Sequence, residues 1–562
     1  MTEPIYGGQA VVEALKNENV RHVFGLIGSA TMEVFDGLYE ANSIQFVGVH
    51  DERTGTHMAD GYARASGGPG VIIAGQNGPG ATNLLTGLAQ ASAAYSPVVA
   101  IAGALSSAHV YRDAFQEVDQ HATLSPVAKS SVTVPSVERI PELFQAGFRT
   151  ALTPRRGPVL LNLPRDVQSA KASFPDPPAP ESYRVQFAPA APAAAVEQAA
   201  QMLLDAERPV IVAGGGIKNC GGAAQALALA ELLGAPVAMS PGHGDAIPFG
   251  HPLNAGQMGP RGNPVASRLV LEADVILALG TRLGFNSTFY SYDNISRDAA
   301  IIQVEIEPTE IGRHFPVSLG IWADAPTVAE QLAEAVRNAT AIREATQWTA
   351  QFQAERKAFL ARRDAEAAMD EAPIQPSGLF RAYRRVLPRN AAIVLDAGTM
   401  TLQATDALEY WEPPCLFTPL DFGLVGFSFA CGLGVKAAQP DRPVISFAGD
   451  GGFGMQISEL STAVDAGLNT VTVVMNNGCW GAEKAYQRDF FGERYIGADV
   501  SSPPFDELAR LYGGVGYRVE RLSEVEDAIA AALDADKPAV VDIKVDPDAL
   551  YSFRRDSFAH RM

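Results

Sequence analysis

Short runs of apolar and β-branched residues alternate with helix-length stretches along almost the whole chain. Continuous apolar runs of this length predict strands that are buried on both faces. Strands that alternate with helices predict parallel sheets covered by helices, and ligands on such sheets bind beyond the carboxyl ends of the strands. The clearest runs lie at 47–50, 71–74, 98–102, 210–213, 275–279, 301–306, 392–396, 444–448, 470–475 and 539–544.

Two interruptions divide this pattern into three blocks. Residues 174–195 are rich in proline and lack a periodic pattern, which is typical of an extended surface linker. A charged, alanine-rich stretch at 344–370 predicts a helix, and prolines at 370–377 end it. The sequence therefore predicts three α/β domains, each with a doubly wound parallel sheet, over residues 1–172, 190–345 and 375–548.

Composition and charge narrow the function classes. The 562 residues are 47% hydrophobic and 19% charged, so each block has apolar material for a core. A formal net charge of −20 argues against binding to a nucleic acid or an anionic membrane, although a few local donors could still hold a small anion. Four scattered cysteines indicate no disulfide framework, and we find neither a leader pattern nor an apolar run of membrane-spanning length. We therefore expect a cytoplasmic protein that acts on a small molecule.

A glycine-rich turn directly follows the run at 444–448. Its sequence is Gly449-Asp450-Gly-Gly-Phe-Gly454, which contains the spacing of a dinucleotide-binding fingerprint. That interpretation requires an acidic residue after the next strand, but Asn476-Asn477 stands there instead. Asp450 and Asn477 offer hard oxygen ligands at the ends of neighbouring strands, which favours a Mg²⁺ site. The free amides at 451–453, where a helix is expected to begin, suit a diphosphate.

The turn and the asparagine pair together resemble the thiamin diphosphate motif of the pyruvate oxidase and acetohydroxyacid synthase superfamily. The resemblance extends over nearly the whole chain and implies a pyrimidine-binding, a central and a diphosphate-binding domain. It implies that Asp450 and Asn477 bind Mg²⁺ through their side chains and that Cys479 binds it through its carbonyl. In the segment that keeps the cofactor bent, Gly423 would accept from the 4′-amino group and Val425 would lie between the two rings. The predicted cofactor-binding residues are Glu52, Asp396, Gly398, Thr399, Gly423, Val425, Gly449, Gly451, Gly452, Phe453 and Asn477.

A second segment begins with His50-Asp-Glu52-Arg. On its own it could be an exposed helix start, with Glu52 in a solvated first turn. The resemblance instead implies that Glu52 hydrogen-bonds N1′ of the aminopyrimidine and favours the imino tautomer, which removes the C2 proton. Glu52 and the metal ligands lie nearly 400 residues apart, and in the family they meet across a dimer interface. The resemblance therefore implies a homodimer or homotetramer with the active site between two chains.

Two further segments indicate the subfamily. Gln76-Asn77 precedes Gly-Pro-Gly, where the acetohydroxyacid synthases usually have Thr-Ser, and Trp480-Gly-Ala-Glu483-Lys484 stands where they have a Leu-Gly-Met type of sequence. Both segments resemble the sulfoacetaldehyde acetyltransferases, which implies that sulfoacetaldehyde and phosphate are converted into acetyl phosphate and sulfite. Gln116 and either Gln76 or Asn77 are then expected to hydrogen-bond the alkoxide as it develops. The predicted substrate-side residues are His109, Arg112, Lys129, Arg165, Trp480, Glu483 and Lys484.

Several alternatives stay open at this point. A salt-bridged helix start would also explain residues 480–484. The chain could be an acetolactate synthase-like enzyme that decarboxylates a 2-keto acid and joins it to a second one, a 2-hydroxyacyl-CoA lyase, a flavin-dependent oxidase or an inactive scaffold. A scaffold has no reason to retain Glu52, Asp450 and Asn477 together. In the central block Gly214-Gly-Gly216 could help to hold FAD or ADP, but tight packing explains the glycines equally well, and neither nucleotide is predicted.

Overall fold

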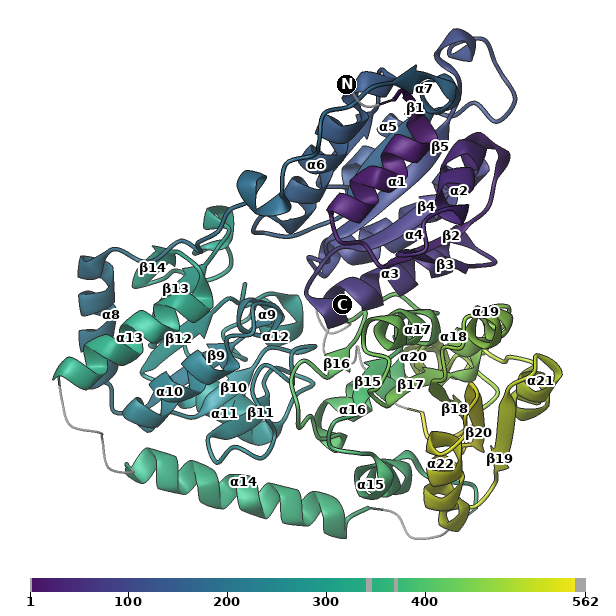
Figure 1. The fold of residues 1–562 in the computed structure, drawn as a ribbon. Coiled ribbons are helices and arrows are strands. Elements are labelled where there is room, and N and C mark those ends of the chain that lie inside the picture. Colours follow the sequence, from purple (N-terminus) through teal and green to yellow (C-terminus); the bar gives the residue numbers. More distant parts are fainter. Residues whose placement is uncertain (1–2, 340–345, 368–371, 551–562) are drawn as a thin grey trace.

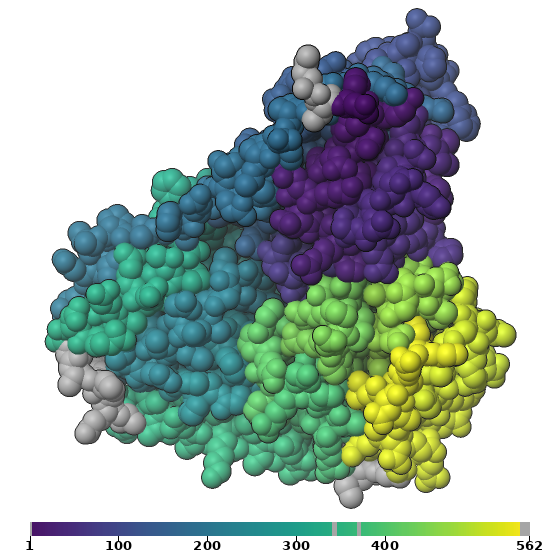
Figure 2. Space-filling model, viewed as in Figure 1, coloured from purple at the N-terminus to yellow at the C-terminus, as the bar shows by residue number. Residues whose placement is uncertain are grey.

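Three α/β domains make up the chain in a computed structural model that describes residues 3–339, 346–367 and 372–550. The N-terminal domain stands on the C-terminal domain, and the central domain lies beside both (Figure 1, Figure 2). Each domain contains one six-stranded parallel sheet with helices packed against it. The predicted fold class is therefore confirmed. Two of the predicted domain limits, residues 1 and 345, lie outside the described residues.

The N-terminal domain is built on six strands: β2 (His22–Leu26), β3 (Gln45–Gly48), β4 (Gly70–Ala74), β5 (Val98–Ala104), β6 (Ser130–Thr133) and β7 (Val159–Pro164). Their order in the sheet is β3-β2-β4-β5-β7-β6. Helices cover the faces, so the middle strands β4 and β5 are buried almost throughout. The helices are α1 (Gly7–Asn17), α2 (Met32–Tyr39), α3 (Glu52–Ser66), α4 (Pro79–Ala93), α5 (Gln120–Leu124), α6 (Ile140–Leu152) and α7 (Arg165–Ser169).

The C-terminal domain repeats this topology with β15 (Ala392–Leu395), β16 (Leu416–Phe417), β17 (Val444–Gly449), β18 (Val471–Asn476), β19 (Val515–Val519) and β20 (Ala539–Lys544). The order is β16-β15-β17-β18-β20-β19, so both domains read 2-1-3-4-6-5 when each domain's strands are numbered along the chain. Its helices are α15 (Pro376–Val386), α16 (Thr399–Ala407), α17 (Ser428–Ala438), α18 (Asp450–Gly454), α19 (Glu459–Asp465), α20 (Gly481–Phe490), α21 (Phe505–Leu511) and α22 (Val525–Leu533).

The central domain has a different strand order. Its strands are β9 (Pro209–Ala213), β10 (Val237–Met239), β11 (Asn254–Gln257), β12 (Val275–Leu279), β13 (Ala300–Glu305) and β14 (Leu319–Trp322). The sheet reads β11-β10-β9-β12-β13-β14, which is 3-2-1-4-5-6 along the chain and places the switch point between β9 and β12. The helices are α8 (Ala193–Asp205), α9 (Gly215–Asn219), α10 (Ala223–Leu233), α11 (Pro264–Glu272), α12 (Phe285–Thr288), α13 (Ala325–Ala339) and α14 (Gln347–Ala365).

The predicted strands all occur, each within a few residues of its predicted limits. The charged stretch predicted as a helix at 344–370 is α14 over the residues that the structure describes. A further two-stranded sheet pairs β1 (Ile5–Tyr6) with β8 (Lys171–Ala172) and joins the two ends of the N-terminal domain. In the described parts of the chain, no helix combines the length and the apolar character needed to cross a membrane.

The N- and C-terminal domains meet where α3 crosses α17. Glycines make the close approach possible, because an added Cβ at Gly61 would lie 2.2 Å from the Cys431 carbonyl oxygen and one at Gly434 would lie 1.8 Å from the Met58 carbonyl oxygen. Beside this crossing the buried carboxylate of Glu459 accepts hydrogen bonds from the N-terminal domain. The two sheets are therefore held at a fixed distance by backbone contact, which sets where their carboxyl edges lie.

Candidate active site

The first part of the site lies at the carboxyl edge of the C-terminal sheet. Strands β17 and β18 are direct parallel neighbours, and Gly449 lies opposite Met475. Asp450 and Asn477 therefore leave adjacent strand ends, as the sequence predicted. Asp450 begins the short helix α18, which contains residues 451–453 as expected.

Asp450 has an oxygen available for a cation. Its Oδ2 accepts a hydrogen bond of 2.5 Å from Ser502 Oγ, whereas its Oδ1 is buried and lacks a hydrogen-bond partner among the described residues. Burial raises the pKa of this carboxyl above its usual value, and the hydrogen bond from Ser502 opposes the rise. An unpaired buried carboxylate oxygen is costly unless a ligand satisfies it, so the position fits a Mg²⁺ ligand.

The backbone after Asn477 leaves the carbonyl of Cys479 free of a partner in the neighbouring segment 498–500, as a metal-binding carbonyl requires. Trp480 donates its amide to Ala498, and Gly478 accepts from Val500, so these two residues pair with residues 498–500. In this antiparallel arrangement the N–H and C=O of Cys479 point away from the paired segment. Its N–H lies 3.3 Å from Asn477 Oδ1, which turns that side chain toward the same loop. The described residues contain no cluster of three or more His, Cys, Asp or Glu side chains suited to a metal, and the predicted ligand set includes only one such side chain, Asp450.

Three of the predicted cofactor glycines border open space. An added Cβ at Gly398, Gly423 or Gly449 would meet no atom within 4 Å, and the first two have φ values of 140° and 79°. Glycine at these positions lets backbone approach a ligand closely. By contrast, an added Cβ at Gly451 would lie 2.5 Å from the ring of Trp480. Trp480 thus packs under the turn that carries Asp450.

Asp396 holds a neighbouring segment of its own chain in place. Its carboxylate accepts from the backbone amides of Gly426, Phe427 and Ser428 at 2.8 to 2.9 Å, and from the Ser428 hydroxyl at 3.1 Å. The side chain that the sequence placed among the cofactor contacts is therefore committed to its own chain, where it fixes the segment after Val425. Thr399 lies nearer to the metal ligands, since an added Cβ on Gly481 would lie 3.6 Å from its hydroxyl and 3.1 Å from Asn477 Nδ2.

The second part of the site lies at the carboxyl edge of the N-terminal sheet. Glu52 begins α3, which Asp51 caps, and it is only 3% exposed, so a solvated helix start is excluded. Asn83 Nδ2 donates to Glu52 Oε2 at 2.9 Å, while Gly80 leaves room beside Oε1. Burial raises the pKa of Glu52, and the hydrogen bond from Asn83 opposes this. Asn83 was not predicted as a functional residue; it lies on α4, three residues after Gly80, and the glycine-rich start of that helix was the available signal.

The three predicted oxyanion-binding side chains come together. Gln76 Nε2 donates to Gln116 Oε1, and Asn77 Nδ2 donates to the Gln116 carbonyl at 3.0 Å. Gln116 has a positive φ of 63°, which aims it back at the turn between β4 and α4. Gly78 is required there, since an added Cβ would lie 2.4 Å from the Gln116 carbonyl oxygen.

The predicted substrate-side residues divide into three groups. His109, Arg112 and Arg165 follow β5 or β7 and are exposed at the carboxyl edge. Lys129 precedes β6 at the opposite edge and donates to the Thr153 carbonyl, so the expectation that it lies near the substrate is corrected. The remaining three begin α20, where Glu483 is exposed, Trp480 packs on Gly451, and Lys484 forms a 2.8 Å ion pair with Asp499.

Glu52 and the metal ligands belong to different domains, and the described hydrogen bonds do not join them directly. Glu52 accepts from Asn83, and Asp450 accepts from Ser502. The hydrogen bonds between the two domains near Glu52 include those from residues 50–54 to Met455 and Glu459. The N-terminal and the C-terminal domain therefore each carry one half of the predicted site.

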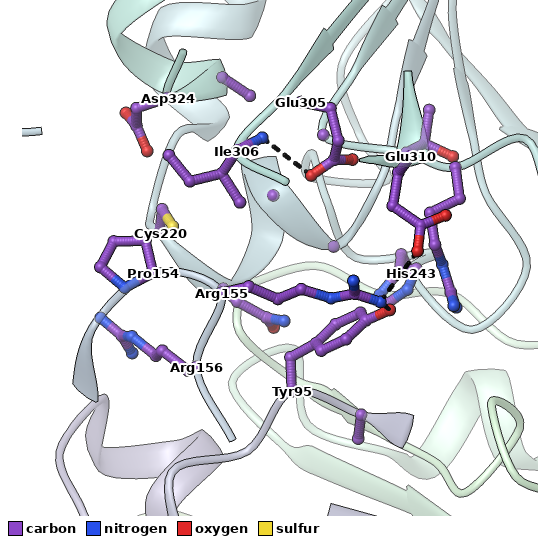
Figure 3. A pocket seen from close by; sticks show the side chains of 18 of the residues that line it. Tyr95, Pro154, Arg155, Arg156, Cys220, His243, Glu305, Ile306, Glu310 and Asp324 are labelled. Atoms are coloured by element: carbon purple, nitrogen blue, oxygen red, sulfur yellow. Dashed lines mark hydrogen bonds and ion pairs between the residues drawn. The ribbon is translucent and has the colours of Figure 1, made fainter. Parts of the chain in front are cut away.

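A cavity of about 700 Å³ separates the N-terminal and central domains (Figure 3). Arg155 extends across it toward Tyr95 and Glu310. The triple glycine beside the cavity serves packing, because an added Cβ at Gly214 would lie 2.4 Å from the Gly280 carbonyl oxygen and one at Gly216 would lie 2.6 Å from its Cα. These glycines therefore give no independent indication of a bound nucleotide.

Comparison with known proteins identifies the same three domains. Models of the thiamine pyrophosphate enzymes match in order: the N-terminal TPP binding domain at residues 5–123, the central domain at 196–332 and the C-terminal TPP binding domain at 396–543. A sulfoacetaldehyde acetyltransferase of Alcaligenes xylosoxydans is 33% identical over 98% of this chain and 95% of its own length. A probable acetolactate synthase large subunit of Methanocaldococcus jannaschii is 32% identical over 96% and 92%, and the acetolactate synthase large subunit of Corynebacterium glutamicum is 32% identical over 97% and 88%. Such similar identities do not separate the two activities.

Proposed function

Because the chain belongs to the thiamine pyrophosphate (thiamin diphosphate) enzymes, we propose that it uses this cofactor and Mg²⁺ to convert sulfoacetaldehyde and phosphate into acetyl phosphate and sulfite. The observation that carries the substrate assignment is the sequence Trp480-Gly-Ala-Glu483-Lys484, which begins α20 directly beside Asn477. The 33% identity to a sulfoacetaldehyde acetyltransferase along the full chain supports the assignment.

The residues at the C-terminal sheet edge fit the diphosphate and its metal. Asp450 Oδ1, the Asn477 side chain and the Cys479 carbonyl would hold Mg²⁺. Gly423 and Gly449 border the open space in which the cofactor would lie. When bound, thiamin diphosphate supplies a C2 carbanion that attacks a carbonyl carbon.

Glu52 would hold the exchanging proton at the other end of the cofactor. Burial raises its pKa toward the working pH, where proton transfer between a carboxyl group and a ring nitrogen is most effective. Asn83 orients the carboxyl through Oε2, and Gly80 keeps the space beside Oε1 open. Oε1 is therefore the oxygen that we assign to the aminopyrimidine N1′.

The amides at the N-terminal sheet edge would stabilise negative charge on the substrate. Gln76 donates to Gln116 Oε1, which orients the Gln116 amide group and leaves its Nε2 to donate to the substrate oxygen. Donors that are fixed before the reaction stabilise a developing oxyanion most effectively, because they need no reorganisation.

The start of α20 offers a cation for the sulfonate or for phosphate. Both anions are tetrahedral and need donors around several oxygens. Lys484 is paired with Asp499, but the Asp499 side chain is 76% exposed, and exposed pairs contribute little free energy. A substrate anion can therefore replace Asp499 as the partner of Lys484 at small cost.

The proposal includes a homo-oligomer with the site between two chains. Glu52 and Asp450 lie on different domains without a described hydrogen bond between them, and the family resemblance implies that they meet across a dimer. The loop that carries Gln116 also exposes two large aromatic side chains, Tyr111 at 96% and Phe115 at 83%. Aromatic side chains so exposed next to a site are typical of a protein–protein contact, and a second copy of the chain would cover them.

A second candidate function is the condensation of two 2-keto acids. The acetolactate synthase relatives, which are 31% to 32% identical over at least 96% of the chain, favour it. Both reactions need the same cofactor and the same Glu52. They differ in the group that leaves the donor, which is sulfite in one case and CO₂ in the other.

A donor assay separates the two candidates. The holoenzyme is incubated with sulfoacetaldehyde and phosphate, or with pyruvate, and sulfite, acetyl phosphate, CO₂ and acetolactate are measured. We expect sulfite and acetyl phosphate from the first mixture and little acetolactate from the second. Lys484→Ala should raise KM for sulfoacetaldehyde or phosphate about tenfold, as the loss of a charge-assisted hydrogen bond does, whereas Arg488→Ala on the same helix should not. Acetolactate as the main product, without sulfite release, would favour the second candidate.

A further inference from the structure

The loop that leads to Gly423 is held by both other domains. Arg64 of the N-terminal domain donates from both guanidinium NH groups to the Thr418 carbonyl at 3.2 Å. From the central domain, Asn286 Nδ2 donates to the Leu420 carbonyl at 3.3 Å, and Arg282 lies 3.6 Å from the Asp421 carboxylate. Residues 418–421 thus have three anchors from two domains, one to four residues before residues 422–425, which contain the predicted cofactor-binding residues Gly423 and Val425.

The residues 422–425 themselves have few restraints. Phe422 is 51% exposed, and an added Cβ at Gly423 would meet nothing within 4 Å. The amides of Phe422 and Gly423 both donate to the Pro419 carbonyl, at 3.0 and 2.7 Å, so the turn moves as a unit with residue 419. The position of the Gly423 carbonyl is therefore set mainly by what holds the preceding loop and by Asp396 on the following side.

Arg282 is in turn fixed by a chain of contacts across the cavity of Figure 3. Its guanidinium lies 5.3 Å from the centre of the Tyr95 ring, and that of Arg155 lies 4.4 Å from the same ring. Arg155 also donates to the Tyr95 hydroxyl and forms a 3.1 Å ion pair with Glu310, as Figure 3 shows. Guanidinium groups so close to an aromatic ring are attracted to its face. Both guanidinium groups therefore contact the Tyr95 ring, although Tyr95 has a left-handed backbone, with φ 55°, a costly conformation for a tyrosine.

We propose that the contacts Glu310–Arg155–Tyr95–Arg282–Asp421 position the cofactor-binding segment 422–425, with Arg282 and Asp421 as the positioning residues. The inference rests on the proposed function, because it assigns residues 422–425 to thiamin diphosphate. It assigns a role that the cofactor motif itself does not include: the central domain would set cofactor affinity through an ion pair. Neither positioning residue needs to touch the cofactor or the substrate.

The test uses the full chain and five proteins: the unmodified protein, Arg282→Gln, Asp421→Asn, Arg282→Lys and the control Arg156→Gln. Arg156 lines the same cavity, but it donates to the Gly67 carbonyl and is not a member of the proposed chain of contacts. Thiamin diphosphate is titrated calorimetrically with excess Mg²⁺. We expect Arg282→Gln and Asp421→Asn to bind it about five- to tenfold more weakly, the size of a typical coupling between sites. Arg282→Lys should recover part of this loss, and Arg156→Gln should bind normally.

Two further measurements separate positioning from general damage. At saturating cofactor, kcat of Arg282→Gln should return close to the unmodified value while KM for the cofactor stays raised. In the cofactor-free proteins, amide hydrogen exchange at residues 419–427 should be faster in Arg282→Gln and Asp421→Asn than in Arg156→Gln. Unchanged affinity and unchanged exchange in both variants would overturn the proposal. If the unmodified protein bound no thiamin diphosphate, the proposed function would fall, and the exchange rates alone would still decide whether the ion pair holds this segment.

Discussion

Two buried carboxyl groups, Glu52 and Asp450, carry most of the proposed chemistry. Burial raises the pKa of both, and each has a single side-chain donor, Asn83 in one case and Ser502 in the other. A carboxylate that is buried with an unsatisfied oxygen destabilises the folded chain. Such groups are found where a ligand restores the missing interaction; Asp450 Oδ1 has no partner among the described residues, and we propose Mg²⁺ for it and a ring nitrogen for Glu52.

The metal assignment predicts a loss of cofactor affinity. Asp450→Ala or Asn477→Ala removes one Mg²⁺ ligand and leaves diphosphate charge uncompensated, so thiamin diphosphate should bind at least about tenfold more weakly. Asn469→Ala, at the other end of β18, is the matched control and should bind normally. Calorimetric titration in the presence of Mg²⁺ measures the three affinities. Equal affinities in all three variants would refute the metal site.

The raised pKa of Glu52 predicts a pH-dependent difference in stability. Because its pKa is higher in the folded than in the unfolded chain, the folded chain binds more protons in the window between the two values. The free energy of unfolding therefore falls as the pH rises through that window. The amide in the variant Glu52→Gln still accepts from Asn83, but the variant carries no carboxyl group at this position whose ionisation in the folded chain costs free energy. The cofactor-free variant should therefore become more stable than the unmodified protein as the pH rises.

Denaturant unfolding of both cofactor-free proteins between about pH 5 and pH 8 tests this. The difference in free energy should grow with pH in favour of Glu52→Gln. A difference that is independent of pH, or one that favours the unmodified protein at high pH, would show that Glu52 is not held in a destabilising environment.

At the scale of the elements, the sequence predicts most of those strands that are buried on both faces of a sheet. The runs at 71–74, 98–102 and 444–448 are continuous and apolar because their strands lie in the middle of a sheet. Two of the unpredicted strands lack that signal: β16 has only two residues, and β19 is a half-exposed edge strand with the sequence VGYRV. By contrast, β7, with the sequence VLLNLP, is fully buried and was missed although it carries the signal. Adjacent strand ends could be inferred from the α/β alternation, which is why Asp450 and Asn477 were paired correctly.

What the sequence could not supply is the set of contacts between distant segments. The hydrogen bond from Gln76 to Gln116 depends on a loop with several left-handed residues. No local sequence pattern indicates the path of this loop. The use of Asp396 as an acceptor for three backbone amides likewise depends on the return of the chain at residues 426–428. The expectation for Lys129 is wrong because β6, with the sequence SSVT, lacks an apolar run, so the sequence does not indicate that Lys129 lies at the amino edge of a strand.

The close crossing of α3 and α17 predicts that one added methyl group lowers the stability of the folded chain strongly. Gly434→Ala would place a Cβ 1.8 Å from the Met58 carbonyl oxygen, and neither helix backbone can yield without separating the two domains. We expect a loss of about 2–3 kcal/mol in the free energy of unfolding, the usual effect of overpacking. Gly68→Ala just after α3 is the control, since its Cβ would meet only Ser66 Oγ at 3.6 Å. Denaturant melts in which the two variants behave alike would contradict this view of the crossing.

At the scale of the whole molecule, the proposed site between two chains predicts complementation between them. Each of the variants Glu52→Gln and Asp450→Ala should be nearly inactive alone. A mixed dimer has one site with both native residues if the site spans two chains, so co-expression should restore activity to about a quarter of the normal value by random pairing. Activity that stays at the level of the single variants would indicate a site within one chain, or a monomer.

The exchange of the C2 hydrogen of bound thiamin diphosphate for deuterium is the measurement that bears most directly on the proposed chemistry. It reports whether the chain activates the cofactor, whatever the donor. The holoenzyme is mixed with D₂O, quenched in acid and analysed by NMR. The unmodified protein should exchange C2–H orders of magnitude faster than Glu52→Gln, because proton transfer by a positioned group contributes about 10²- to 10⁴-fold, while both proteins bind the cofactor. Exchange in Glu52→Gln at the rate of the unmodified protein would contradict the assignment of Glu52 as the activating residue.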